Sequence, residues 1–193
     1  MSAYQPLRRL SLFRGGLFAN EGAASRNLRA HCFHPVWALL AEHVRRSGAQ
    51  SVIEVGCGTG EFARLLRDLG IPEYLGLDTN AARLAKARAN CPEYRFEVAD
   101  VFLTNHLRGE NYDVAVMTGF LEFVRWDLVA LELVRPHRRV LGTVTAGDEP
   151  GRVRQFTTAN QVLDHYSPVL RELRVEPIHL PHGRTAFLFD GIK

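Results

Sequence analysis

The sequence of 193 residues predicts an α/β fold, a doubly wound, seven-stranded and mostly parallel sheet with helices on both faces. Two observations favour this class. Strand-like apolar runs alternate with helical patterns along the chain, and a β-branched run ends in a glycine turn that opens a helix. Near the C terminus, two alternating segments flank Pro181-His182-Gly183, a connection too short for a crossover helix. The last two strands must therefore be antiparallel.

The spacing of apolar residues predicts each element in turn. Pro35 begins a helix that Ser47-Gly48 ends, and Thr158 with Gln161 forms a capping box at the start of a later helix. In chain order, helices are expected from 35, over 62–69, over 80–89, near 126–135 and from 158 to about 166, and strands over 52–55, 74–78, 94–101, 112–117, 140–145, 173–180 and 185–190.

The glycine turn carries most of the functional information. Gly56, Gly58 and Gly60 follow a strand-like run at alternate positions, and a helical pattern follows at once. Glycine lets a backbone bend sharply and approach a ligand closely, because it has no Cβ. The start of the next helix offers free N–H groups and a partial positive charge. The turn therefore predicts a nucleotide-type pocket at the carboxyl end of a strand.

The spacing of the turn does not suit a dinucleotide. The dinucleotide fingerprint needs a third glycine where this chain has Glu61, whose carboxylate would face a pyrophosphate. Glu54, two residues before Gly56, also favours a ligand that carries positive charge, such as an ammonium or a sulfonium group.

Five segments resemble the class I S-adenosylmethionine (SAM)-dependent methyltransferases. Residues 52–60, Val-Ile-Glu-Val-Gly-Cys-Gly-Thr-Gly, are similar to motif I of that family. Residues 74–78, 94–101 and 112–117 resemble its second, third and fourth strands in order. Residues 118–122 resemble the segment beside the reacting methyl group. The resemblance covers about residues 50–190.

The resemblance implies the strand order 3-2-1-4-5-7-6 and SAM as cofactor, with S-adenosylhomocysteine (SAH) as product. It implies that Asp78 binds both ribose hydroxyls and that Asp100 contacts the adenine amino group. The residues themselves leave alternatives open, since Asp78 could cap the following helix and Asp100 could be a turn residue. Cys57 is interpreted as a small residue of the loop and not as a nucleophile. The expected cofactor-binding residues are Glu54, Gly56, Cys57, Gly58, Gly60, Asp78, Thr79, Asp100, Val101 and Thr118.

The chain departs from the family pattern in three places. Residues 135–139 lack the glycines that usually precede the fifth strand, which puts the geometry of that turn in question. Phe123 stands where many small-molecule members have a histidine. No Asn/Asp-Pro-Pro-aromatic sequence follows the fourth strand, which argues against methylation of adenine or amide nitrogens in nucleic acid or glutamine.

Methyl transfer needs mainly alignment, and a base only if the acceptor must lose a proton. The catalytic residues are not fixed by the sequence; Glu122 and His34 are candidates. Substrate contacts are expected from His31, His34, Arg152 and Arg154, and no metal is expected.

The organisation expected is an N-terminal arm or lid over residues 1–34 and a single SAM-binding domain over residues 35–193. A solvated arm is the alternative to a lid. Three cysteines without a C-x-x-C pattern predict neither disulfides nor a zinc site. No apolar stretch long enough to span a membrane and no signal-peptide pattern is present, which predicts a cytoplasmic protein without membrane partners.

The sequence therefore predicts a SAM-dependent methyltransferase that acts on a small-molecule acceptor, with an anionic or aromatic acceptor favoured. The alternatives are a non-catalytic SAM-binding accessory protein, or a methyltransferase that acts on protein or RNA. No dense basic run with interleaved aromatics supports a nucleic-acid partner.

Overall fold

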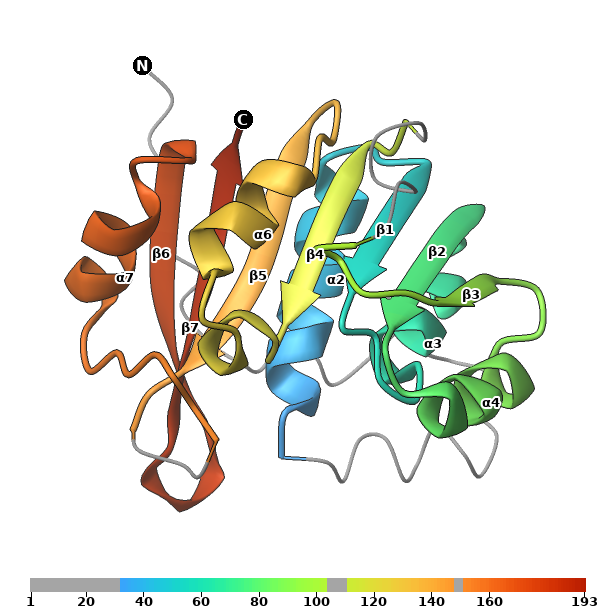
Figure 1. Ribbon diagram of the computed structural model, residues 1–193, viewed down its shortest axis with the longest axis horizontal. Coiled ribbons are helices and arrows are strands. Elements are labelled where there is room, and N and C mark those ends of the chain that lie inside the picture. The colour runs from blue at the N-terminus through green and yellow to red at the C-terminus, as the bar shows by residue number, and fades with distance from the viewer. Residues whose placement is uncertain (1–31, 104–110, 148–150) are drawn as a thin grey trace.

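The computed structural model describes residues 32–103, 111–147 and 151–193 (Figure 1). Of the predicted arm over residues 1–34, only residues 32–34 are therefore described, and the prediction that the arm is a lid lies almost entirely outside the described residues.

The core of the fold is one seven-stranded sheet with the order β3-β2-β1-β4-β5-β7-β6, which confirms the expected order (Figure 1). Neighbouring strands from β3 to β5 are parallel, whereas β7 is antiparallel to both β5 and β6. The strands are β1 (Ser51–Val55), β2 (Glu73–Asp78), β3 (Arg95–Val98), β4 (Val114–Thr118), β5 (Arg139–Thr145), β6 (Arg171–His179) and β7 (Thr185–Ile192).

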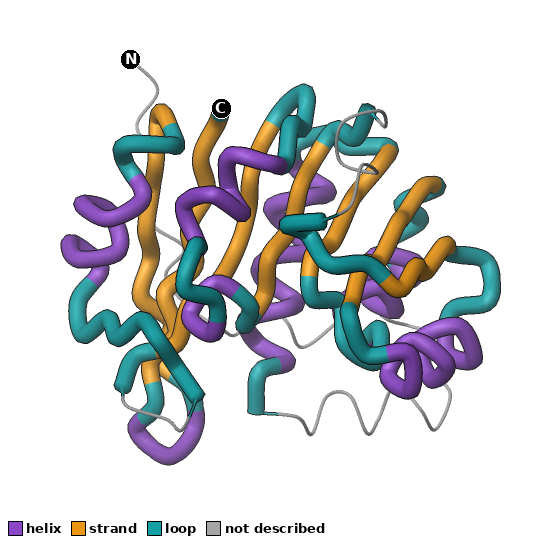
Figure 2. The backbone as a smooth tube through the Cα atoms, in the orientation of Figure 1, coloured by secondary structure: helices purple, strands orange, loops and turns teal. Residues whose placement is uncertain are grey.

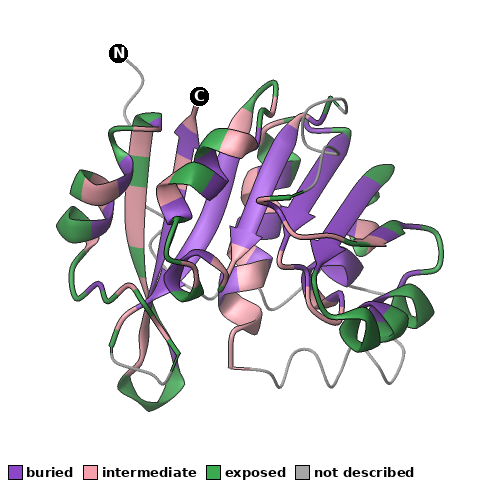
Figure 3. Ribbon diagram, in the orientation of Figure 1, coloured by how far each residue is buried: buried purple, intermediate pink, exposed green. Residues whose placement is uncertain are grey.

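Helices cover both faces of the sheet, as Figure 2 shows. Apolar residues of α2, α3 and α4 form one core cluster with the sheet, and those of α6 and α7 form a second. All five residues of the central strand β1 are buried, as expected for a parallel strand covered on both faces (Figure 3). The helices are α2 (His34–Arg46), α3 (Glu61–Asp68), α4 (Ala81–Asn90), α6 (Asp127–Leu133) and α7 (Ala159–Tyr166), with 3-10 turns η2 (Leu121–Phe123) and η3 (Pro181–Gly183).

The N-cap of α7 is the one predicted from the sequence, whereas the N-cap of α4 is not Asp78. The capping box of Thr158 and Gln161 is present at the start of α7. At α4, in contrast, the cap is Asn80, whose side-chain oxygen accepts hydrogen bonds from the N–H groups of Ala82 and Arg83. Asp78 is therefore not the cap of α4, and its carboxylate is used elsewhere.

The turn before β5 is held without glycine. The N–H of His137 donates to the carbonyl of Tyr112 at 2.8 Å, and the N–H of Arg138 donates to the carbonyl of Asp113 at 2.9 Å. The guanidinium of Arg138 also contacts the Asp113 carboxylate. These bonds to the start of β4 bring β5 into parallel register with it, so the missing glycines do not alter the sheet.

Candidate active site

The site lies at the carboxyl ends of β1, β2, β4 and β5, where two cavities adjoin. One has a volume of about 440 Å³ and is lined from β2 and the segments after β3 and β4. The other has a volume of about 260 Å³ and reaches from the glycine turn to β5 and α2. Gly56, Gly119 and Phe123 line both cavities. A ligand that spans the two would therefore pass between these residues.

Asp78 connects the larger cavity to the glycine turn. Its Oδ2 accepts a hydrogen bond from the N–H of Gly58 at 2.9 Å, and its Oδ1 accepts one from the N–H of Asn80 at 2.8 Å. Each carboxylate oxygen has two acceptor positions. The carboxylate can therefore hold the turn and still accept two hydroxyl groups from a ligand in the cavity that it lines.

Asp100 lines the same cavity. Its Oδ1 accepts a hydrogen bond from the N–H of Phe102 at 2.9 Å, which is the turn arrangement expected as the alternative. The other oxygen of the carboxylate does not take part in that bond, so the turn role and a ligand contact are compatible. Thr79 and Val101 also line this cavity.

The glycine turn presents backbone to the cavities. Gly58 has a φ of +57°, and a Cβ built on it would meet nothing within 4 Å. At Gly56, in contrast, a Cβ would lie 2.9 Å from the Phe120 ring, and φ is +79°. Gly60 is the N-cap of α3 and has a left-handed conformation. Glu61 follows it in the first turn of that helix. Gly56 and Gly60 thus let the turn close, while Gly58 leaves room beside its backbone.

Glu54 provides a buried carboxyl at the smaller cavity. It is 1% exposed, and burial raises its pKa to about 7. Tyr74 Oη donates to Oε2, and Thr118 Oγ1 donates to Oε1 at 3.0 Å. Glu61 lines the same cavity and adds negative charge. This acidic end suits a cationic group and opposes a pyrophosphate.

Cys57 has a packing role in the turn. Its sulfur lies against β2 where Gly76 leaves space, since a Cβ on Gly76 would be 2.7 Å from Cys57 Sγ. Burial raises the pKa of the Cys57 thiol well above its usual value, so the thiol stays protonated. A buried neutral thiol is a poor nucleophile, which agrees with the interpretation from the sequence.

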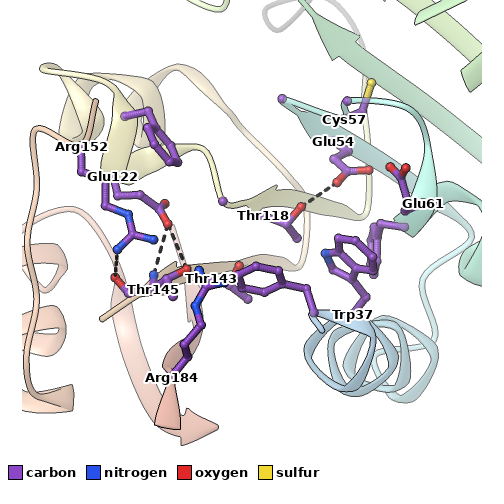
Figure 4. A pocket seen from close by; sticks show the side chains of 16 residues that line it. Trp37, Glu54, Cys57, Glu61, Thr118, Glu122, Thr143, Thr145, Arg152 and Arg184 are labelled. Atoms are coloured by element: carbon purple, nitrogen blue, oxygen red, sulfur yellow. Dashed lines mark hydrogen bonds between the residues drawn. The ribbon is translucent and has the colours of Figure 1, made fainter. Parts of the chain in front are cut away.

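The smaller cavity is also lined by residues that sequence reasoning missed. Trp37 and Phe33 from the start of α2 contact each other, with ring centroids 6.3 Å apart. The Arg184 guanidinium lies 5.0 Å from the Phe33 ring centroid, and Thr143 lies on β5 beside it (Figure 4). Phe33 directly precedes α2 and Arg184 directly precedes β7. No sequence pattern could show that these two elements meet here.

Glu122 and Arg152 line the smaller cavity at the end away from Glu54 and Glu61 (Figure 4). Glu122 Oε1 accepts hydrogen bonds from the N–H and the hydroxyl of Thr145, at 3.2 and 3.3 Å. Arg152 Nη1 donates to the carbonyls of residues 145, 146 and 147. The Arg152 guanidinium also lies 5.9 Å from the Phe123 ring centroid. Arg152 therefore both braces the end of β5 and presents positive charge to the cavity.

Arg154 is placed differently from Arg152. It donates from Nε and Nη2 to Oδ1 of Asp127, at 3.2 and 3.1 Å, and does not line either of the two described cavities. His165 Nε2 lies 2.8 Å from the other oxygen of Asp127. Backbone N–H groups of Val153 and Arg154 donate to the Glu122 carbonyl. The structure thus assigns Arg154 a place in the support of the cavity wall.

Of the two candidate histidines, only His34 is described, and it is not brought into either cavity. His34 is the first residue of α2 and does not line either of them, while its neighbour Phe33 does. His31 lies outside the described residues. Among the described residues, no group of three His, Cys, Asp or Glu side chains is arranged to hold a metal ion.

The strand order, the glycine turn and the paired cavities together define a Rossmann-like nucleotide-binding domain. A methyltransferase domain family matches residues 52–142. This match supports the resemblance to the class I SAM-dependent methyltransferases, and SAM as the cofactor, as expected from the sequence.

Individual relatives are distant. The chain is 27% identical over 144 residues to trans-aconitate 2-methyltransferase of Delftia acidovorans; the match covers 74% of this chain and spans only 50% of that relative's length. In fold, it is similar to the N-terminal domain of EvdMO1 with SAH bound, with a TM-score of 0.64, 13% identity and coverage of 93% and 99% of the two chains. A TehB-like SAM-dependent methyltransferase from Corynebacterium glutamicum gives a TM-score of 0.62, 21% identity and coverage of 88% and 94%.

None of the helices in the described residues is both long and apolar enough to cross a membrane.

Proposed function

We propose that this chain transfers a methyl group from SAM to a small-molecule acceptor bound in the smaller cavity. The observation that carries the proposal is the junction of the two cavities at Gly56, Gly119 and Phe123. A cofactor that fills the larger cavity and the acidic end of the smaller one has its centre at this junction. The remaining end of the smaller cavity then faces that centre.

The residues present fit SAM. Asp78, which lines the larger cavity, would accept the ribose hydroxyls, and Asp100 in the lining of the same cavity would contact the adenine amino group. Glu54 is a buried carboxyl, and the ammonium group of SAM would form an ion pair with it. When bound, SAM supplies a methyl group that is activated by its sulfonium. The chain then contributes alignment, because holding two reactants in line accounts for much of such a rate acceleration.

The acceptor end favours an anionic or aromatic small molecule. Phe33 and Phe123 supply aromatic walls, and Arg184 and Arg152 beside them supply positive charge. Guanidinium groups bind carboxylates and phosphates through paired hydrogen bonds. A non-catalytic accessory role is not favoured, because a second cavity adjoins the proposed cofactor site and the chain is similar to a family of enzymes.

We expect SAM and SAH to raise the melting temperature and NAD and NADP to leave it unchanged. Glu54 and Glu61 oppose a pyrophosphate but suit a cation. A ligand at about 100 times its Kd adds roughly 2.7 kcal/mol to the free energy of unfolding, or about 5–11 °C for a chain of this size. Differential scanning fluorimetry with each ligand measures this. Stabilisation by NAD without stabilisation by SAM would overturn the proposed function.

A further inference from the structure

The carboxyl group of Glu122 is buried, hydrogen-bonded at one oxygen and unpartnered at the other. Its side chain is 1% exposed, and Thr145 fixes Oε1 through two hydrogen bonds. Oε2 has no hydrogen-bond partner among the described residues. Leaving a buried carboxyl oxygen without a partner costs free energy, and here it belongs to a residue that lines the acceptor end of the smaller cavity.

The backbone around Glu122 keeps this carboxyl in place. Its carbonyl accepts hydrogen bonds from the N–H groups of Val153 and Arg154, at 2.8 and 3.1 Å. Those two residues belong to the loop that Asp127 holds through Arg154. Backbone and carboxyl are thus anchored separately, on the loop and on β5. Oε2 therefore has a defined position and lacks only a donor.

We propose that Oε2 of Glu122 accepts a hydrogen bond, and then the proton, from the O–H or N–H group of the acceptor that receives the methyl group. The proposal rests on the function proposed above. Figure 4 shows Glu122 at the opposite end of the cavity from Glu54 and Glu61, with Thr118 between them. A group held by Glu122 therefore lies on the far side of the cavity from the residues assigned to the cofactor.

The proton balance of the step is complete. The nucleophilic oxygen or nitrogen forms a bond to the methyl carbon, and the carbon–sulfur bond breaks with its electron pair going to sulfur. The proton of the acceptor passes to the Glu122 carboxylate and later to water. A positioned base of this kind contributes about 10²–10⁴-fold to a rate.

The same geometry selects the chemical class of the acceptor. A hydroxyl or amino nucleophile satisfies Oε2, whereas a nucleophilic carboxylate would bring two negative charges together. Any anionic group on the acceptor belongs instead near Arg184, away from the reacting atom. We therefore expect methylation of O–H or N–H groups.

The first arm of the test measures binding with defined probes. With SAH present in saturating amount, 4-hydroxybenzoate and 4-aminobenzoate are titrated against 4-methoxybenzoate and 4-dimethylaminobenzoate. The wild type should bind the O–H and N–H probes about tenfold more tightly than their methylated counterparts, as one hydrogen bond to a charged group provides. Glu122→Gln replaces the acceptor with an N–H donor and should abolish this preference. Glu42→Gln, a carboxyl paired with Arg45 and Arg46 on α2, is the matched control and should retain it.

The second arm measures SAH formation from saturating SAM with 4-hydroxybenzoate. Glu122→Gln should lower kcat at least 100-fold while leaving SAH affinity unchanged. In the wild type, kcat should rise with pH through the Glu122 pKa, which burial raises, because the base must be ionised. Arg152 and Tyr166 face Glu122, and Arg184 and Glu54 line its cavity. Because Glu54 also titrates in this cavity, the rise is attributed to Glu122 only where Glu122→Gln removes it.

The outcomes separate the two proposals. If the wild type binds SAH but prefers no O–H or N–H probe, the role of Glu122 is wrong and the proposed function stands. The same holds if Glu122→Gln keeps the wild-type preference or the wild-type pH profile. Failure of the wild type to bind SAH contradicts the proposed function itself. The comparison of probes on the wild type decides the question even if Glu122→Gln does not fold.

Discussion

Replacement of Asp78 by alanine is expected to lower the affinity for SAM by roughly 10–150-fold. The carboxylate would lose charge-assisted hydrogen bonds to two ribose hydroxyls, worth about 1.5–3 kcal/mol in all. It would also lose the bond to the Gly58 N–H that holds the glycine turn. Asp78→Asn should do less harm, because an amide oxygen still accepts. Isothermal titration of SAH into each variant measures the change.

Asn80→Ala is the matched control for Asp78→Ala. Asn80 caps α4, so its loss should cost about 0.5–2 kcal/mol of stability and leave the affinity for SAM unchanged. Unchanged SAM affinity in a folded Asp78→Ala protein would show that Asp78 only supports the turn, and the ribose assignment would then be wrong.

Replacement of Asp127 by alanine is expected to destabilise the fold by about 2–3 kcal/mol, which lowers the melting temperature by roughly 4–12 °C. Asp127 is fully buried and holds Arg154 and His165. Arg154 and His165 are partly exposed to solvent. The loss of stability should therefore be smaller than when a fully buried charge is left without its partner. The change also removes a negative charge from the first turn of α6.

A double-mutant cycle locates the interaction. The effects of Asp127→Ala and Arg154→Ala should be less than additive, because each removes the same ion pair. Asp164→Ala, a change of an exposed aspartate on α7, is the control and should alter the melting temperature little. Additive effects of the two changes would contradict the ion pair as a support of the loop.

Most of the sheet could be predicted from the sequence because local patterns and family likeness agree. The glycine turn fixes the β1–α3 unit, and the short connection at 181–183 requires the antiparallel pair β6–β7. The ends of elements were less predictable. β3 was expected over 94–101 but covers Arg95–Val98, since the chain leaves the sheet to form the Asp100 turn.

The proposed cofactor side of the site follows more directly from the sequence than the proposed acceptor side. The expected cofactor residues follow one another at the ends of adjacent parallel strands, which meet at one edge of the sheet. The acceptor end joins the start of α2, the end of β5 and the start of β7, which are far apart in the sequence. No local pattern marks such a meeting. Arg152 and Arg154 were equivalent in the sequence, and only the position of Asp127 distinguishes them.

Methyl transfer itself is tested most directly with SAM labelled in its methyl group. The protein is incubated with labelled SAM and a low-molecular-mass metabolite extract, and label in products is compared with SAH formed. We expect label to enter a small-molecule product with an equal amount of SAH, and Asp78→Ala to reduce both. Tight binding of SAM without any SAH above the rate in buffer would contradict an enzymatic role and favour a non-catalytic SAM-binding protein.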